Sequence, residues 1–214
     1  MASNKEPSAR LETPPFIVMF PNAFKAVKSE LADADATPKF GLTAVFDSSK
    51  WNETHKRKFK AILDALEASS QAAFKKPWAS LKSDKKGLRR NEERETVFDF
   101  TPGKTYFANL TSTRKPDVID VNGDPINAEE GNTDKLYQGC ICKATVRVFD
   151  YDKKGSKGVA LGLFNIQVLV SDPKKAPRRD NSKSASEDFS EEDESAFLGQ
   201  FDEDEPEADD DSNY

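Results

Sequence analysis

Residues 139–170 read GCICKATVRVFDYDKKGSKGVALGLFNIQVLV and predict a long β-hairpin. Apolar and polar side chains alternate over residues 139–151 and again over residues 159–170, which is the period of strands with two unlike faces. The residues between them, 152–158, read Asp-Lys-Lys-Gly-Ser-Lys-Gly and are typical of a hairpin loop.

The two faces of the first hairpin strand differ in chemistry. One face is small and apolar, which suits the interior of a barrel, and it consists of Cys140, Cys142, Ala144, Val146 and Val148. The other face interleaves cations with aromatic rings, and it consists of Ile141, Lys143, Thr145, Arg147, Phe149 and Tyr151.

The mixed face has the composition of a site for single-stranded nucleic acid. Such a ligand presents flat bases and a charged backbone, so a sequence-tolerant site needs aromatic platforms beside basic side chains. We therefore predict that Phe149 and Tyr151 stack on bases. The predicted phosphate contacts are Lys143, Arg147, Lys153, Lys154 and Lys157. The alternative is that the two rings fill a small satellite core and the lysines only keep a turn soluble.

A further strand, outside the hairpin, is predicted over residues 104–111. Tyr106 and Phe107 fall on opposite faces of this strand, so one ring belongs to the core and the other is a further candidate platform. Phe107 is favoured as the platform because its face also carries Thr105, Asn109 and Thr111. Arg114 and Lys115 follow on a loop and are further candidate phosphate contacts.

Three more strands and one helix are expected upstream of the hairpin. The strands cover residues 16–20, 39–46 and 116–121, the last of which ends at an Asn-Gly turn. Apolar positions at three- and four-residue spacing predict a helix over residues 51–75, with an N-terminal cap in Asp47-Ser-Ser. Residues 77–95 are charged and lack an apolar period, so we expect a mobile excursion there.

Five or six strands and one helix fit a small closed barrel with an inserted helix, which is the plan of an OB-fold. A β-sandwich would accommodate the strands almost as well. We expect this mainly β domain to cover residues 1–173, and residues 174–214 to form a flexible linker and acidic tail.

Charge divides the chain into two unlike parts. Residues 187–214 contain fourteen of the 38 acidic side chains and no Lys or Arg, which leaves 24 acidic against 32 basic side chains in residues 1–186. Phe189, Phe197, Phe201 and Tyr214 lie among the acidic residues, so the tail offers negative charge and aromatic rings together, as DNA does. We expect the tail to compete with DNA and to bind partners, mainly through Phe197, Phe201, Asp209, Asp210, Asp211 and Tyr214. A tail that only keeps the protein soluble is the alternative.

An enzyme is disfavoured by what the chain contains. The single histidine, His55, falls on the apolar stripe of the predicted helix, and no Gly-rich phosphate loop is present. We therefore expect no catalytic residue, metal or cofactor. A weaker alternative is a magnesium-dependent nuclease or annealing enzyme that uses Asp117, Asp120 and Asp124. The two cysteines are expected to be reduced, and no run of about 18 apolar residues exists to span a membrane.

Several motifs resemble one family. They are Phe20-Pro-Asn-Ala-Phe24, Pro116-Asp-Val-Ile-Asp-Val-Asn-Gly, Tyr137-Gln-Gly-Cys140, Val148-Phe-Asp-Tyr-Asp, Lys157-Gly-Val-Ala-Leu-Gly162 and Gln167-Val-Leu-Val. Over most of residues 15–172 the chain resembles single-stranded DNA-binding proteins of tailed phages, distantly akin to those of lytic podoviruses.

The resemblance implies an OB-fold that binds single-stranded DNA in phage replication, recombination or repair. It also implies a soluble protein in the cytoplasm of the infected bacterium, whose acidic C-terminus contacts replication proteins such as a DNA polymerase or helicase. Related tails commonly end in phenylalanine, whereas this chain ends in Tyr214. A homodimer is compatible with the sequence. The rival hypothesis is an interaction protein whose tail mimics DNA and inhibits a host nucleic-acid enzyme.

Overall fold

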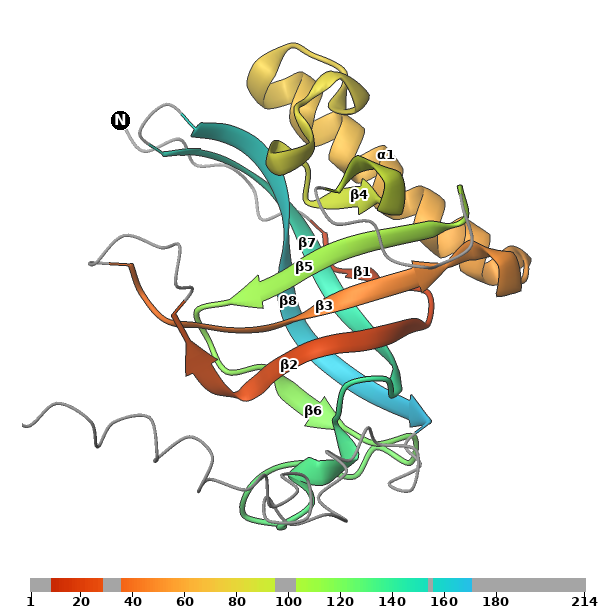
Figure 1. Cartoon of the computed structure of the whole chain (residues 1–214), viewed down its shortest axis with the longest axis vertical. Coiled ribbons are helices and arrows are strands. Elements are labelled where there is room, and N and C mark those ends of the chain that lie inside the picture. The colour runs from red at the N-terminus through yellow and green to blue at the C-terminus, as the bar shows by residue number, and fades with distance from the viewer. Residues whose placement is uncertain (1–8, 29–35, 95–102, 154–155, 171–214) are drawn as a thin grey trace, which may run out of the picture. The chain divides into compact units, whose positions relative to one another are not determined.

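The computed structural model describes residues 9–28, 36–94, 103–153 and 156–170, and within them eight strands and one α-helix (Figure 1). The strands are β1 (Leu11–Glu12), β2 (Phe16–Val27), β3 (Lys39–Asp47), β4 (Leu88–Arg90), β5 (Thr105–Ser112), β6 (Asp117–Ile119), β7 (Ile141–Lys153) and β8 (Ser156–Val170). The helix is α1 (Glu53–Phe74). Short 3-10 turns are η1 (Ser48–Lys50), η2 (Trp78–Ser80), η3 (Ser83–Lys85), η4 (Asn91–Glu93) and η5 (Thr133–Lys135).

The main strands close into a barrel in the order β7-β2-β3-β5-β8, and β7 pairs with β8 to complete the ring. The pairing of β5 with β8 is parallel, whereas the other pairings in the ring are antiparallel. This closed topology confirms the predicted OB-fold-like barrel and is not a β-sandwich. β1 and β4 add to the predicted strand count, because strands of two and three residues are too short to show a period.

The barrel interior is apolar and continues into the aromatic face of α1. The predicted interior row of β7 is confirmed, since Cys142, Ala144, Val146 and Val148 are all buried. The ring of Phe59 on α1 lies with its centroid 5.6 Å from that of Phe46 on β3. Figure 1 shows α1 packed along one side of the barrel, so the helix closes the core there.

The helix begins later than expected and has a different cap. The side chain of Asn52 accepts a hydrogen bond from the His55 backbone N–H at 2.9 Å, which makes Asn52 the N-cap of α1. Asp47 instead caps η1 by accepting from the backbone N–H of Ser49 at 3.0 Å. Lys75 ends α1 in the left-handed conformation, with φ 56°. In the described part of the chain, no helix is both long and apolar enough to cross a membrane.

Residues 78–94 are folded, so the predicted mobile excursion is wrong there. β4 pairs antiparallel with β5, while Lys86 bridges Val159 of β8 in parallel. The ion pair of Lys86 with Glu93, with 2.8 Å between Nζ and Oε1, fixes this segment, and only 8% of the Lys86 side chain is exposed. Leu88 is buried in the core and Trp78 and Leu81 pack against it. These three apolar residues are separated by charged ones and are too few to show a period, so the hydrophobic pattern did not reveal the structure.

Candidate nucleic-acid interface

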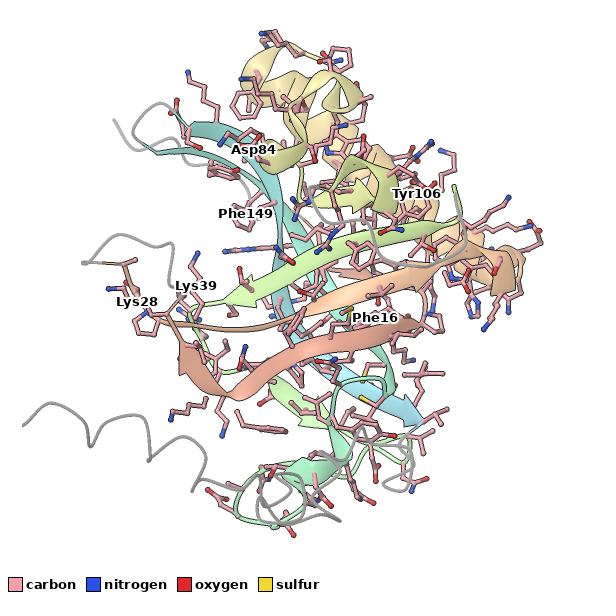
Figure 2. All side chains as sticks on the ribbon, viewed as in Figure 1. Phe16, Lys28, Lys39, Asp84, Tyr106 and Phe149 are labelled. Carbon is pink, nitrogen blue, oxygen red and sulfur yellow. The ribbon has the colours of Figure 1, made fainter. Side chains whose placement is uncertain are left out.

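The mixed face of β7 lies on the outside of the barrel. Its alternate residues fill the interior, so the remaining side chains project outward. Phe149 is 36% exposed, and Arg147 is exposed beside it with its guanidinium carbon 5.9 Å from the Phe149 ring centroid. In the view of Figure 2, Phe149 projects toward the same side of the barrel as Lys28 and Lys39. The structure thus places the ring of Phe149 and the guanidinium of Arg147 side by side on one exposed surface.

Glycines of β8 give these side chains their room. Arg147 pairs with Gly162, and a Cβ at Gly162 would lie 3.3 Å from Arg147 Cγ and 3.4 Å from Phe149 Cε1. Tyr151 pairs with Gly158, where a Cβ would lie 2.5 Å from the Tyr151 hydroxyl oxygen. The side chains of β7 therefore lie across β8, and Tyr151 is half-buried while Phe149 keeps more of its ring exposed.

The basic residues of this face differ in how far their charge is already neutralised. Lys143 pairs with Glu12 of β1, with 3.0 Å between Nζ and Oε1, and Glu12 also pairs with Lys58 of α1 at 2.9 Å. Lys157 at the hairpin pairs with Asp152 at 3.0 Å. Arg147 has no carboxylate within ion-pair distance among the described residues. Among the described side chains of β7, its charge is therefore the most available.

Two of the predicted lysines cannot be placed. Lys154 and the side chain of Lys153 lie outside the described residues, as do the tail residues Phe197, Phe201, Asp209, Asp210, Asp211 and Tyr214. Their roles remain predictions.

The two rings of β5 differ in exposure, and Phe107 is not an open platform. Phe107 is only 1% exposed, and the Arg94 guanidinium carbon lies 4.1 Å from its ring centroid. The choice of Phe107 as a base platform is therefore wrong, because the folded segment before β5 covers it. Tyr106 faces the other way and packs against Phe59 of α1, with ring centroids 5.0 Å apart.

Exposed cations also lie on the loop after β5 and on the arm, our name for the paired end of β2 and start of β3. Arg114 and Lys115 are exposed, directly after the end of β5. Sequence reasoning missed the basic residues of the arm, which are Lys25, Lys28 and Lys39. They became visible only through the register that pairs Val27 with Lys39. Phe20, with φ 50°, is 55% exposed at the base of this arm and is a further ring that the sequence did not single out.

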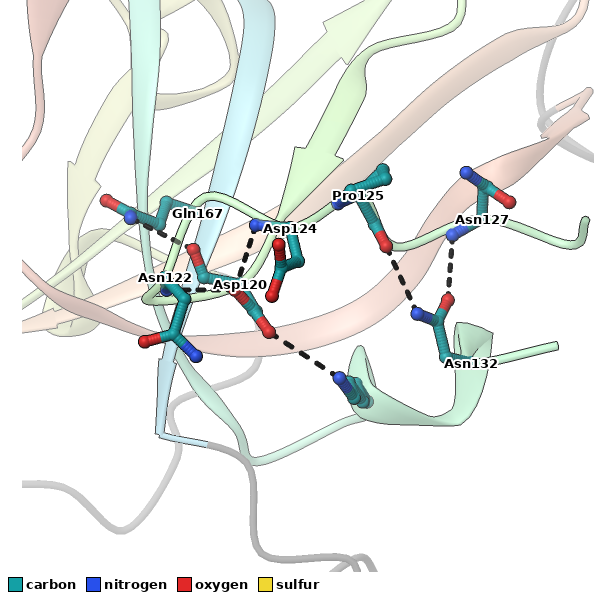
Figure 3. Close-up of polar contacts among 8 residues, drawn as sticks. Asp120, Asn122, Asp124, Pro125, Asn127, Asn132 and Gln167 are labelled. Carbon is teal, nitrogen blue, oxygen red and sulfur yellow. Dashed lines mark hydrogen bonds and ion pairs between the residues drawn. The ribbon is translucent and has the colours of Figure 1, made fainter. Parts of the chain in front are cut away.

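The aspartates near β6 build a turn (Figure 3). Asp120 Oδ1 accepts hydrogen bonds from the backbone N–H groups of Asn122 at 2.8 Å and Asp124 at 3.1 Å. Asp120 Oδ2 lies 3.5 Å from Lys135 Nζ, and the Gln167 side chain donates to the Asp120 carbonyl at 3.0 Å. Within the described residues, no three His, Cys, Asp or Glu side chains gather as metal ligands. The cluster therefore gives no support to a magnesium-dependent enzyme.

Comparison with known proteins agrees with this geometry. The family model described as Enterobacter phage Enc34, ssDNA-binding protein, matches residues 16–198. The chain belongs to the Enc34 phage single-stranded DNA-binding protein family. The resemblance found in the sequence motifs is thereby confirmed.

Solved structures of phage proteins share the fold of this family member. The single-stranded DNA-binding protein of bacteriophage Enc34 in complex with ssDNA has a TM-score of 0.60 and 14% identity, covering 80% of this chain and 97% of that chain. The single-stranded DNA-binding protein gp2.5 of bacteriophage T7 has a TM-score of 0.51 and 11% identity, covering 86% and 98%.

A curated relative gives a shorter match. The protein p50 of Acyrthosiphon pisum secondary endosymbiont phage 1 is 36% identical over 82 residues, which cover 38% of this chain and 41% of that relative. The match therefore spans less than half of either protein.

Proposed function

We propose that this protein binds single-stranded DNA without sequence preference and acts without catalysis in phage DNA replication, recombination or repair. Membership of the Enc34 family supports the proposal, and the Enc34 protein itself has been solved in complex with ssDNA. The observation that carries it is the exposed ring of Phe149 beside the unneutralised guanidinium of Arg147 on the outer face of β7.

The chemistry of this pair suits a ligand of any sequence. Every base has a flat face that stacks on an aromatic ring, and a guanidinium binds the phosphate that every nucleotide carries. Stacking requires an unpaired base, because the faces of bases in a duplex are already covered by their neighbours. The pair therefore favours single strands over duplexes.

The proposed path of the DNA follows the usual surface of an OB-fold. In that fold the second and third strands, with the loops that join strands one to two and four to five, bind oligonucleotides. Here those strands are β3 and β5, and the loops join β2 to β3 and β7 to β8. One strand of DNA would then lie between two groups of basic residues. The first group is on the arm and consists of Lys25, Lys28 and Lys39, and the second is on the hairpin.

We further propose that residues 1–173 form the DNA-binding domain and that residues 174–214 form a linker and tail. The fourteen acidic residues of 187–214 would compete with DNA for the basic surface. When DNA displaces them, they would be available to recruit replication proteins. A homodimer is compatible with this arrangement.

The experiment replaces the ring and leaves the barrel intact. Phe149→Ala should weaken binding of a fluorescein-labelled oligo-dT by about 1–3 kcal/mol, because one stacking contact is lost. Val121→Ala is the control, because Val121 is 62% exposed in the Asp120 turn, outside the proposed surface. If Phe149→Ala and Tyr151→Ala both bind like the wild type in an anisotropy titration, the assignment of this face is wrong.

A further inference from the structure

Arg10 and Phe164, which the sequence did not single out, extend the mixed face of β7. The Arg10 guanidinium carbon lies 4.2 Å from the Phe164 ring centroid, and that of Arg147 lies 5.7 Å from the same centroid. Arg147 also lies 5.9 Å from the Phe149 ring, so the series Arg10, Phe164, Arg147 and Phe149 alternates cations with rings. Three separate segments of the chain contribute to this series.

A β-bulge places Phe164 in the series. Val146 pairs with Leu163 and Thr145 pairs with Asn165, so Phe164 is an extra residue between two consecutive pairs. Such a bulge changes the direction of side chains on its strand. Leu163 and Ile166 point into the core, while Phe164 is half-buried and contacts the two guanidinium groups.

The register of β1 brings two like charges together. Leu11 pairs with Val146 and Glu12 with Thr145, so continuing this antiparallel register sets Arg10 opposite Arg147. Like charges at opposed positions repel one another. Among the described residues, neither guanidinium has a carboxylate within ion-pair distance, and the nearby Glu12 is already held by Lys58 and Lys143. An anion bound between or beside the two arginines would relieve the repulsion.

The surface next to the arginines is hollowed, and polar side chains lie at the edge of a largely apolar floor. A cavity of about 270 Å³ is lined by Glu12, Lys143, Thr145, Asn165 and Gln167, together with apolar atoms of Ile119, Ala144 and Ile166. Asn165 follows Phe164 directly, so the cavity continues the same face of β7 and β8 away from the hairpin loop.

We propose that Arg10 binds a backbone phosphate of single-stranded DNA next to the phosphate that Arg147 binds. Phe164 holds the Arg10 guanidinium over its ring at 4.2 Å, and a guanidinium over a ring can still donate its N–H groups to phosphate oxygens. This inference rests on the proposed function, and it carries the DNA path past Phe149 toward β1. The chain then covers more nucleotides than the hairpin end of the face alone.

The test separates charge from packing. Arg10→Met keeps an unbranched apolar side chain on the Phe164 ring but removes the charge, and Arg10→Lys keeps the charge. Arg57→Met is the matched control, because Arg57 is exposed on α1. For each variant, the affinity for a long oligo-dT is measured across a salt series, and the melting temperature is measured in parallel.

Arg10→Met should lower the magnitude of the log-log salt slope by about 0.7, the value for one phosphate of a single strand, and weaken binding severalfold in low salt. Arg10→Lys should keep most of the slope, and Arg57→Met all of it. A wild-type salt slope in Arg10→Met overturns the inference. An equal loss of DNA affinity in both Arg10 variants, together with lower melting temperatures, also overturns it, because Arg10 would then only anchor β1. If Phe149→Ala still weakens binding in either case, the proposed function stands. Failure of the wild type to bind oligo-dT would reject both.

Discussion

At the scale of single residues, Glu12 controls how much positive charge the face of β7 offers. Burial of its carboxylate raises the pKa of Glu12, but hydrogen bonds from Lys58 and Lys143 outweigh burial and hold the pKa below its ordinary value of 4.5. A carboxyl whose pKa is lowered by folding stabilises the folded state above its ordinary pKa, and this stability is lost as the pH falls through the lowered value. Glu12 is therefore charged at neutral pH, and it shares its one negative charge between Lys58 and Lys143.

Glu12→Gln should lower the melting temperature at pH 7, and the difference from the wild type should shrink as the pH falls below 4.5 toward the lowered pKa. Thermal unfolding at several pH values measures this. The matched control is Glu53→Gln, because Glu53 pairs with Lys56 at 2.7 Å but its side chain is 88% exposed, so its effect should be small at every pH.

The same substitution should tighten the binding of oligo-dT, because Lys143 is released from its partner. The gain should be modest, on the order of 1 kcal/mol or less, as for other partly exposed ion pairs. Weaker binding by Glu12→Gln would contradict a phosphate-binding role for Lys143.

At the scale of elements, β4 pairs with β5, and Lys86 and Gly87 just before it lie against β8. Gly87 makes this possible, since a Cβ at that position would lie 2.7 Å from Ala160 Cα and 2.9 Å from the Val159 carbonyl oxygen. Both are backbone atoms and cannot turn aside. The fit of the segment before β4 against β8 therefore requires glycine at residue 87.

Gly87→Ala should lower the free energy of unfolding by about 1–3 kcal/mol, because the added methyl group pushes the segment before β4 off β8. Chemical denaturation measures the change. Gly162→Ala is the comparison, since its methyl group would meet only side-chain atoms of Arg147 and Phe149 at 3.3–3.5 Å and should cost less stability. Equal effects of the two substitutions would show that the contact between Gly87 and β8 is not tight.

Long elements were predictable from the sequence, and contacts between distant segments were not. The alternation over β7 and β8 predicted both the interior row and the outward position of Phe149. The same argument failed for Phe107, because the residue that covers its ring, Arg94, belongs to a segment without an apolar period. No local pattern could pair Arg10 with Phe164, because a bulge and a two-residue strand bring them together.

At the scale of the whole molecule, positive and negative charge lie in different parts of the chain. The net charge is −6, yet residues 1–186 have more basic than acidic side chains. Residues 187–214 have fourteen acidic side chains and no Lys or Arg. A competing tail would lower the affinity for DNA most strongly at low salt, where charges are least screened.

Removal of residues 187–214 should therefore tighten the binding of oligo-dT severalfold at low salt, and the gain should decline as salt is added. Anisotropy titrations of the two proteins measure this. The rival hypothesis, in which the tail mimics DNA and inhibits a host enzyme, predicts instead that the truncated protein loses its function while its affinity for DNA is unchanged or absent.

The central claim is that the exposed ring and cations of the barrel bind single-stranded DNA of any sequence. The most direct measurement is the affinity of the full chain for labelled oligo-dT, for a mixed-sequence strand and for the corresponding duplex, across a salt series. We predict similar binding of the two single strands, weaker binding of the duplex, and a salt slope of about 0.7 per phosphate contacted. Equal affinity for the duplex, or no binding to either single strand, would contradict the account.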